Sequence, residues 1–252
     1  KTKLSAFKHL RRAGIRAIIL EEGDDLIDAQ LTNGSQDILL SAANGKACRF
    51  CETRVRASGR NTIGVRGMEL RDKNGELTSE LVAMTIAEPD SELLIITAKG
   101  MGKRTPIGTG VTDASVEIDD VEENDVELEN GAADETVVEE LSGTRFNYRR
   151  TNRGAKGVIS IRLRKGDRVV AALPVKANST EDLLLISVAG QTVRLRVQDV
   201  RLTGRDAVGV IVMRLAEDDY VATATIVDEL SEEEIAANQA RDDEEAEMAE
   251  FE

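Results

Sequence analysis

The chain has 252 residues, of which 41% are hydrophobic and 2% aromatic, with no tryptophan. Its two cysteines and one histidine fall short of the four ligands of a structural zinc site. No apolar run approaches the ~20 residues that span a bilayer. The formal net charge of −14 taken alone argues against a nucleic-acid ligand.

Four stretches share one seven-residue pattern, which we call the glycine frame. It consists of glycine, a branched apolar residue, two variable positions, an apolar residue, one variable position and leucine. The frames are Gly14–Leu20, Gly64–Leu70, Gly157–Leu163 and Gly209–Leu215. Their glycines lie 50, 93 and 52 residues apart, so the middle spacing fits one period plus an insertion. A period near fifty predicts an array in which each copy buries the face its neighbour leaves open.

The chain opens with Lys1–Ser5, which matches the second arm of a hairpin that lacks its first arm. We therefore expect the sequence to be a fragment, or a mature piece, of a longer protein.

Each later period holds a short apolar run, a small-x-Gly turn and a second extended stretch with basic residues. Such runs closed by a glycine turn are typical of strands covered on both faces. The predicted arms are Asp37–Ser41 with Lys46–Phe50, Glu92–Thr97 with Lys103–Pro106, and Asp182–Ser187 with Thr192–Val197.

Two details of these hairpins allow finer predictions. Asn44-Gly45 predicts a type I′ turn, in which both residues need positive φ. The alternation of Arg194–Val197 predicts a strand with one solvated face. No segment before residue 228 shows a helical stripe, so we predict an all-β, propeller-like array of about four units.

Acidic residues gather in two segments that contain almost no bases. Residues 113–140 hold thirteen acids and no lysine or arginine, and residues 228–252 hold twelve acids and one arginine. Of the 47 acids and 33 bases in the chain, 22 acids and 32 bases remain in the body. The repeat body is therefore basic, although the whole chain is acidic.

These segments set the expected organisation. We predict one repeat domain over residues 1–227, interrupted by a disordered acidic insertion at 108–142 and followed by a disordered tail at 228–252. Acidic tails commonly serve solubility. The alternative hypothesis is that they compete with nucleic acid for the basic body.

The candidate catalytic and metal motifs have structural interpretations. Cys48 and Cys51 share one predicted strand, where their side chains point to opposite faces, and we interpret both as structural cysteines. Gly100–Thr105 lacks the first glycine of a phosphate loop and the Ser or Thr after its lysine, and predicts a turn. His9 is the only histidine. We find no catalytic site and expect no metal site or cofactor in this chain.

Basic residues recur in the loop just before each glycine frame, which we call the rim loop. Since these loops occupy the same place in every repeat, we expect their charges to follow one edge of the array and to contact the phosphates of duplex DNA. The alternative is that arginine and lysine simply decorate loops. The candidates are Lys8, Arg11 and Arg12; Arg54, Arg56 and Arg60; Arg145, Arg149, Arg150, Arg153 and Lys156; and Arg201 and Arg205.

Five short sequence segments connect the chain to a known family. They are Lys1–Phe7, Glu22–Ile27, Val55–Gly67, Gly157–Ile161 and Gly204–Ile211. With them the repeats resemble the C-terminal domain of the bacterial DNA gyrase A protein and, less closely, that of its topoisomerase IV counterpart. The resemblance covers nearly the whole chain outside the acidic segments. It implies a β-pinwheel, a propeller-like ring of usually six blades that exchange strands, of which this chain supplies about four.

The resemblance also implies a function. The family bends duplex DNA around a basic rim in a chiral wrap, and the strand-passing core converts that wrap into negative supercoiling. ATP and Mg act through the gyrase B protein, so this chain would hold no cofactor. The implied partners are double-stranded DNA, the N-terminal part of the same gyrase A protein, and gyrase B in a complex with two copies of each. The implied location is the bacterial cytoplasm, with the nucleoid and without a membrane.

Two departures from the family pattern are the signature box and the acidic insertion in the third repeat, which is unlike the usual compact blade. The box of glutamine, two arginines, two glycines, lysine and glycine belongs to a first blade that this sequence lacks, and Asn152–Gly157 resembles a degenerate copy. The active-site tyrosine of the family lies in an N-terminal part outside this sequence, so Tyr148 does not correspond to it. The alternatives are the topoisomerase IV domain and a propeller-like scaffold for protein partners.

Overall fold

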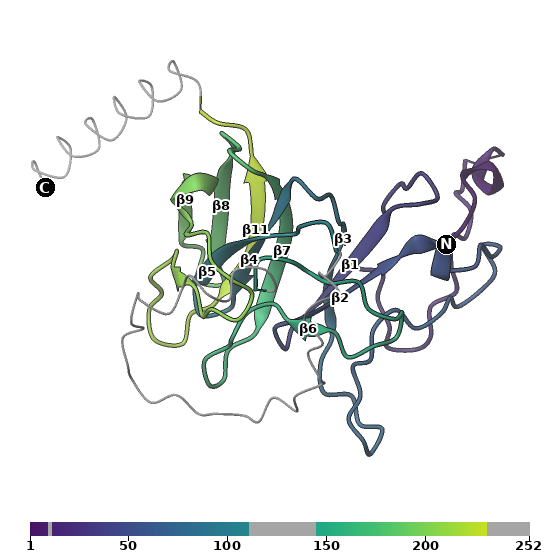
Figure 1. Cartoon of the computed structure of the whole chain (residues 1–252), viewed down its shortest axis with the longest axis horizontal. Coiled ribbons are helices and arrows are strands. Elements are labelled where there is room, and N and C mark those ends of the chain that lie inside the picture. Colours follow the sequence, from purple (N-terminus) through teal and green to yellow (C-terminus); the bar gives the residue numbers. More distant parts are fainter. Residues whose placement is uncertain (10–11, 111–144, 231–252) are drawn as a thin grey trace, which may run out of the picture.

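The computed structural model describes residues 1–9, 12–110 and 145–230. Regular structure in these residues is almost entirely β-strand, in three antiparallel sheets (Figure 1), which confirms the all-β prediction. The predicted insertion and tail lie outside the described residues except at their ends. The strands are β1 (Asp37–Ala42), β2 (Lys46–Cys51), β3 (Leu81–Ile86), β4 (Ser91–Thr97), β5 (Met101–Pro106), β6 (Val158–Ile159), β7 (Val169–Lys176), β8 (Asp182–Ser187), β9 (Thr192–Arg196), β10 (Val210–Ile211) and β11 (Val221–Val227).

Each sheet is built around one hairpin, and two sheets take their outermost strand from a later repeat. The strand orders are β3-β1-β2-β6, β10-β5-β4-β7 and β11-β8-β9. The short strands β6 and β10 belong to the frames that begin at Gly157 and Gly209, and they pair with β2 and β5 of the preceding repeats. The sheets therefore exchange strands, as the resemblance to a pinwheel predicted.

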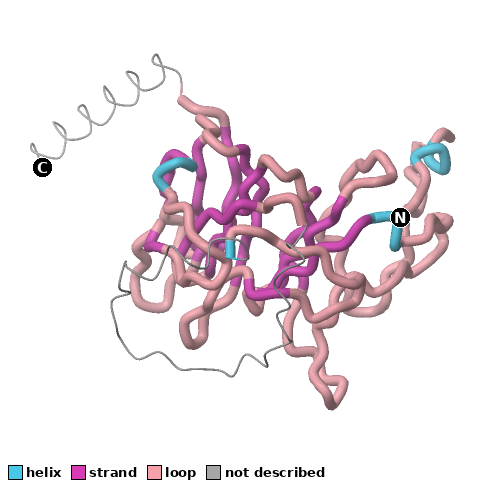
Figure 2. Tube along the Cα trace, in the orientation of Figure 1, coloured by secondary structure: helices cyan, strands magenta, loops and turns pink. Residues whose placement is uncertain are grey.

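The expected four blades correspond to three sheets and a first repeat without strands. In the later repeats, the strand after each frame pairs with the first arm of its own hairpin, as β3 does with β1 and β7 with β4. Residues 12–36 form loops (Figure 2), and Leu26 and Leu31 stay exposed there.

The three predicted hairpins are present, but the turn of the first one differs from the prediction. Every residue of β1 and β4 is buried, so these runs are covered on both faces. The type I′ prediction for Asn44-Gly45 is wrong, because positive φ occurs at Gly45 and not at Asn44. The loop has three residues, Ala43–Gly45, and in a loop of that length only the last residue needs the left-handed conformation.

The sheets stack face to face and bury their apolar residues between them. Leu39 of β1 packs in one cluster with Leu93 and Ile95 of β4, between the first and second sheets. Leu94 and Ile96 of β4 form the next cluster with residues of β8 and the frame that begins at Gly209. The alternation of side chains along β4 thus fills two cores at once.

One ion pair recurs at the same place in every hairpin. An acid near the start of the first arm meets an arginine twelve residues later on the second arm, in the pairs Asp37–Arg49, Glu92–Arg104 and Asp182–Arg194. The Arg49 and Arg104 side chains are only 2% and 7% exposed, whereas that of Arg194 is 30% exposed.

The two buried arginines also join neighbouring sheets. Arg49 donates hydrogen bonds to the carbonyl oxygens of Ile107 (3.2 Å), Gly108 (2.8 Å) and Tyr148 (3.1 Å), where the chain leaves the second hairpin. Arg104 donates in the same way to Val200 (2.8 Å) and Gln198 (3.2 Å), beyond the third hairpin. Each guanidinium therefore fixes the point at which the next rim loop begins.

The first repeat is held to the body by a buried carboxylate. Glu52 accepts hydrogen bonds from Thr32 Oγ1 (2.7 Å), the Gly34 amide (2.9 Å) and the Gln36 amide (3.0 Å), and pairs with Lys1 at 2.9 Å. Burial by itself would raise the pKa of Glu52, but these donors outweigh it and lower the pKa to about 2.

The chain leaves and re-enters the third repeat at one point around the insertion. The Gly110 amide donates to Asn147 Oδ1 (3.0 Å), and the Arg150 amide donates to the Gly110 carbonyl (3.0 Å).

In the described part of the chain, no helix has the length and apolar character needed to cross a membrane.

The glycine at the hairpin turn tests how closely the sheets exchange strands. A Cβ atom at Gly45 would lie 2.6 Å from the Ile161 carbonyl oxygen, whereas one at Gly190 would meet no described atom within 4 Å. Both residues have positive φ, so alanine costs about 1–2 kcal/mol at either position. We expect Gly45→Ala to lower the free energy of unfolding by about 1–3 kcal/mol more than Gly190→Ala. Urea denaturation of dilute samples measures this difference, and equal losses would contradict the packing.

The buried arginine gives a second prediction. Arg49→Gln removes one of the two arginines that pair with the buried Asp37, together with the hydrogen bonds to the Gly108 and Tyr148 carbonyl groups. We therefore expect a loss of about 3–5 kcal/mol in the free energy of unfolding. Arg194→Gln is the matched control, because the same pair is partly solvated there and its loss costs about 1 kcal/mol or less. Denaturant titrations of both variants measure the effect, and equal destabilisation would rule out a special role for the bridging arginines.

Candidate nucleic-acid interface

The rim loops, residues 2–13, 52–63, 145–156 and 197–208, are held at equivalent places by one repeated backbone hydrogen bond. The Thr151 amide donates to the Arg49 carbonyl (2.7 Å) and the Thr203 amide to the Arg104 carbonyl (2.8 Å). The Ser58 amide donates in the same way to the carbonyl of Lys1, in the first repeat (2.9 Å). The middle of each of these three loops therefore lies beside the second hairpin arm, or its counterpart at Lys1, of the repeat before it.

The rim loops at 52–63 and 145–156 enclose a basic hollow of about 840 Å³. No acidic side chain is among the described residues that line it. The bases that line it are Arg54, Arg149, Arg150 and Lys156. The structure thus brings together four of the predicted site residues from two different repeats.

The four cations are held to different degrees. Arg54 donates to Asn152 Oδ1 at 2.9 Å, and Arg150 donates to the buried Asp37 carboxylate at 2.6 Å. That hydrogen bond and the charge of Asp37 raise the pKa of Arg150. Arg149 and Lys156 are exposed and pair with no side chain in the described residues. These two side chains are therefore accessible to an incoming anion.

Three other predicted residues direct their guanidinium groups to backbone carbonyls of the protein itself. Arg153 donates to the Arg66 carbonyl, and Arg60 donates to the Arg16 carbonyl at 2.8 Å. Arg205 donates to the Ile159 carbonyl at 2.6 Å and lies 6.0 Å from the centre of the Tyr148 ring. All three are half-buried and link the rim loops to neighbouring segments.

Arg145 pairs with Asp206 at 3.5 Å, and the remaining candidates are spread along the other rim loops. Lys8, Arg12, Arg56 and Arg201 are exposed, and Arg11 lies outside the described residues. The structure does not place the four exposed residues in the hollow. A DNA contact for them remains a prediction.

One buried lysine was missed in the sequence because it falls in an ordinary hairpin arm. The Lys103 ammonium donates to the carbonyl oxygens of Gly204 and Arg205, both at 2.6 Å. It therefore anchors the last rim loop, residues 197–208, to strand β5. Burial lowers the pKa of Lys103 to about 7. The only signal in the sequence was a lysine next to the arginine of the repeated ion pair.

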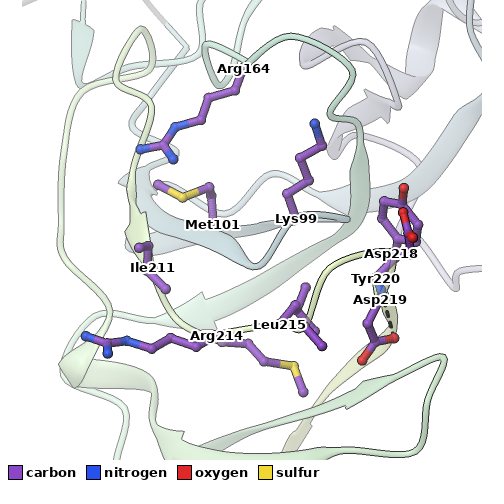
Figure 3. Close-up of a pocket in the computed structure, with 11 residues that line it drawn as sticks. Lys99, Met101, Arg164, Ile211, Arg214, Leu215, Asp218, Asp219 and Tyr220 are labelled. Carbon is purple, nitrogen blue, oxygen red and sulfur yellow. Dashed lines mark hydrogen bonds between the residues drawn. The ribbon is translucent and has the colours of Figure 1, made fainter. Parts of the chain in front are cut away.

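A second hollow, of about 480 Å³, lies beside the turn that joins β4 to β5 (Figure 3). Lys99, Arg164 and Arg214 line it together with two aspartates. Asp219 accepts hydrogen bonds from the Ala189 and Tyr220 amides (3.0 and 2.8 Å). It therefore serves the neighbouring turns. With charges of both signs, this hollow lacks the uniform basic lining of the first.

Comparisons with known proteins connect this geometry to a family. The sequence model for "DNA gyrase C-terminal domain, beta-propeller" matches residues 1–33, 36–79, 91–109, 147–176 and 181–228. It passes over the acidic insertion and most of the tail. Among curated relatives, the DNA gyrase A protein of Escherichia coli (strain K12) is 32% identical over 93% of this chain, and that of Pseudomonas aeruginosa is 33% identical over 92%. The chain spans 22% and 20% of the lengths of these relatives.

Solved structures agree on the fold. The C-terminal domain of DNA topoisomerase IV has a TM-score of 0.66 at 21% identity, over 95% of this chain and 62% of the solved one. The DNA gyrase A C-terminal domain has a TM-score of 0.58 at 22% identity, over 85% of this chain and 58% of the solved one. The repeated glycine frames, the exchanged strands and the match over most of the sequence lead to one conclusion: the chain belongs to the DNA gyrase C-terminal domain family of β-propellers.

Proposed function

We propose that this chain is a noncatalytic module of a gyrase A protein that binds duplex DNA and wraps it along the rim loops. The observation that carries the proposal is the basic hollow, in which Arg54, Arg149, Arg150 and Lys156 converge without an acid among the described lining residues. Such a site suits a phosphate, because cations that replace condensed counterions bind the backbone of any sequence.

Duplex DNA suits this surface better than a single strand. Single strands are bound largely by stacking of bases on aromatic side chains, and the chain has four phenylalanines and two tyrosines. One of these, Tyr148, is completely buried. Smooth bending of 20–30 bp costs about 1–6 kcal/mol, so contacts from several rim loops are needed to hold a wrap.

Within a complete enzyme, the proposed role is to present wrapped DNA to the strand-passing part of gyrase A. The partners would be duplex DNA, the rest of the same gyrase A protein, and gyrase B, which supplies the ATP and Mg chemistry, in the bacterial cytoplasm. A scaffold that binds an acidic protein through the same rim is the competing function, and salt dependence on unrelated DNA separates the two.

Removal of the two unpaired cations of the hollow tests the proposal. We expect the double variant Arg149→Ala with Lys156→Ala to bind a duplex of arbitrary sequence more weakly. The slope of log K against log salt should flatten by up to about 1.8, or 0.9 for each phosphate contact. Fluorescence anisotropy at several salt concentrations measures both quantities.

The control removes the same charge from the other end of the hairpins, where their turns lie. Arg164→Ala with Lys165→Ala takes two exposed bases from beside the β4–β5 turn, and it should leave the salt slope unchanged. An equal loss of duplex affinity in both double variants would mean that only the net charge of the chain matters, and it would contradict the proposed interface.

The type of enzyme can be tested with the complete gyrase A protein. We expect it, reconstituted with gyrase B and ATP, to introduce negative supercoils into relaxed circular DNA, and to lose this activity when residues 1–252 are removed. Relaxation or decatenation without net supercoiling would assign the chain to topoisomerase IV instead. Agarose gels that resolve topoisomers distinguish these outcomes.

A further inference from the structure

Arg150 differs from the other cations of the basic hollow because the protein holds it at two points. Its amide donates to the Gly110 carbonyl (3.0 Å), and its Nε donates to the Asp37 carboxylate (2.6 Å). The amide of the next residue, Thr151, donates to the Arg49 carbonyl (2.7 Å). The Arg150 side chain is nevertheless 54% exposed. It is therefore an arginine that is fixed in place and still accessible from solvent.

Only part of the Arg150 guanidinium is used by the protein. Its Nη1 and Nη2 groups donate to no acceptor in the described part of the chain, and the residue lines the hollow. A guanidinium is planar and presents its donors in a rigid fork, which matches two oxygens of a phosphate at once. With Nε taken by Asp37, the two Nη groups remain for such a bidentate contact.

Asp37 is well placed to hold this side chain. It starts β1 and pairs with Cys51 of β2, which lines the hollow. The Asp37 side chain is only 3% exposed, and its Oδ2 accepts Nε hydrogen bonds from Arg49 (2.8 Å) and Arg150 (2.6 Å). Because Arg49 is buried and hydrogen-bonded to the backbone, it fixes the carboxylate, and the carboxylate in turn fixes Arg150.

The next hairpin has the same ion pair without the exposed arginine. Glu92 pairs there with the buried Arg104, and an isolated β-bridge places Leu202 beside Arg104. The equivalent bridge of the preceding hairpin places Arg150 beside Arg49. A leucine cannot pair with a carboxylate, so Glu92 holds no rim-loop cation among the described residues.

We propose that Asp37 is a positioning residue that prepares Arg150 to clamp one phosphate of the duplex. Asp37 takes the Nε group, and the two Nη groups donate to two oxygens of the phosphate. This role rests on the proposed function, since the ligand is the DNA backbone. A free arginine loses side-chain freedom when it binds, whereas Arg150 has already lost much of it on folding.

Asp37→Asn tests this role because charge and positioning predict opposite results. Asparagine removes a negative charge beneath a basic hollow, so net charge alone would strengthen duplex binding. If Asp37 positions Arg150, the variant should instead bind about 2- to 10-fold more weakly. The slope of log K against log salt should change little, because Arg150 keeps its charge. Fluorescence anisotropy with a duplex of arbitrary sequence measures both quantities.

Glu92→Gln is the matched control. It removes the buried acid of the equivalent pair, so it should destabilise the fold to a similar extent, but no counterpart of Arg150 is released there. We therefore expect a much smaller change in duplex affinity. Circular dichroism and thermal unfolding identify conditions in which both variants are folded. Equal weakening by both would show that a loosened hairpin explains the effect, and it would overturn the proposed role of Asp37.

A double-mutant cycle with Arg150→Ala shows whether Asp37 acts through Arg150. Arg150→Ala should weaken duplex binding and flatten the salt slope by up to about 0.9. In that background Asp37→Asn should cause no further loss of affinity, since the side chain that it positions is absent. A full additional loss would mean that Asp37 acts through Arg49 instead. Either that result, or unchanged or tighter binding by Asp37→Asn alone, would overturn the proposal.

The double variant Arg149→Ala with Lys156→Ala, measured alongside, separates this proposal from the proposed function. If it weakens duplex binding while Asp37→Asn does not, the hollow binds DNA without a positioned clamp, and only the role of Asp37 is wrong. If neither variant weakens binding, the hollow is not a DNA site and both proposals are wrong.

Discussion

A buried guanidinium that bridges two sheets is the interaction on which the array depends. Arg49 and Arg104 satisfy an acid of their own hairpin and also carbonyl oxygens of the next repeat. Ions removed from water are tolerated only when their hydrogen-bonding groups find partners. The position of the second sheet relative to the first is therefore set by a polar group with few alternatives, while apolar packing alone would permit sliding.

This bridge also determines where the basic loops begin. The carbonyl groups that Arg49 binds belong to the chain on either side of the insertion, where the rim loop at 145–156 starts, and Arg104 does the same for the loop at 197–208. Strand exchange then ties the end of each loop to the preceding hairpin. Both ends of a rim loop are thus fixed by the same neighbour, so its charges are presented in a constant orientation along the array.

The hairpins were predictable because apolar runs and turn glycines report local structure directly. The first repeat was not, because residues 12–36 contain the same glycine frame as the later repeats and yet form loops. The predicted basic residues have different roles in the structure. Arg149 and Lys156 are exposed, while Arg153 and Arg205 donate to backbone carbonyls. The residue type alone does not tell an exposed arginine from one that holds the backbone. The buried arginines had a signal, a constant twelve-residue distance from an acid, that a search for exposed charge overlooks.

The paired ends of the acidic insertion have a consequence for how this family can vary. Gly110, before the insertion, is hydrogen-bonded to Asn147 and Arg150, which follow it. The two ends of the insertion are therefore held together, and the rest of the sheet does not depend on its length. Doubling the length of such a loop costs only about 0.6 kcal/mol. Evolution can thus add or delete acidic residues at this junction, beside two cations of the basic hollow, and adjust the local electrostatic field without redesigning the β framework.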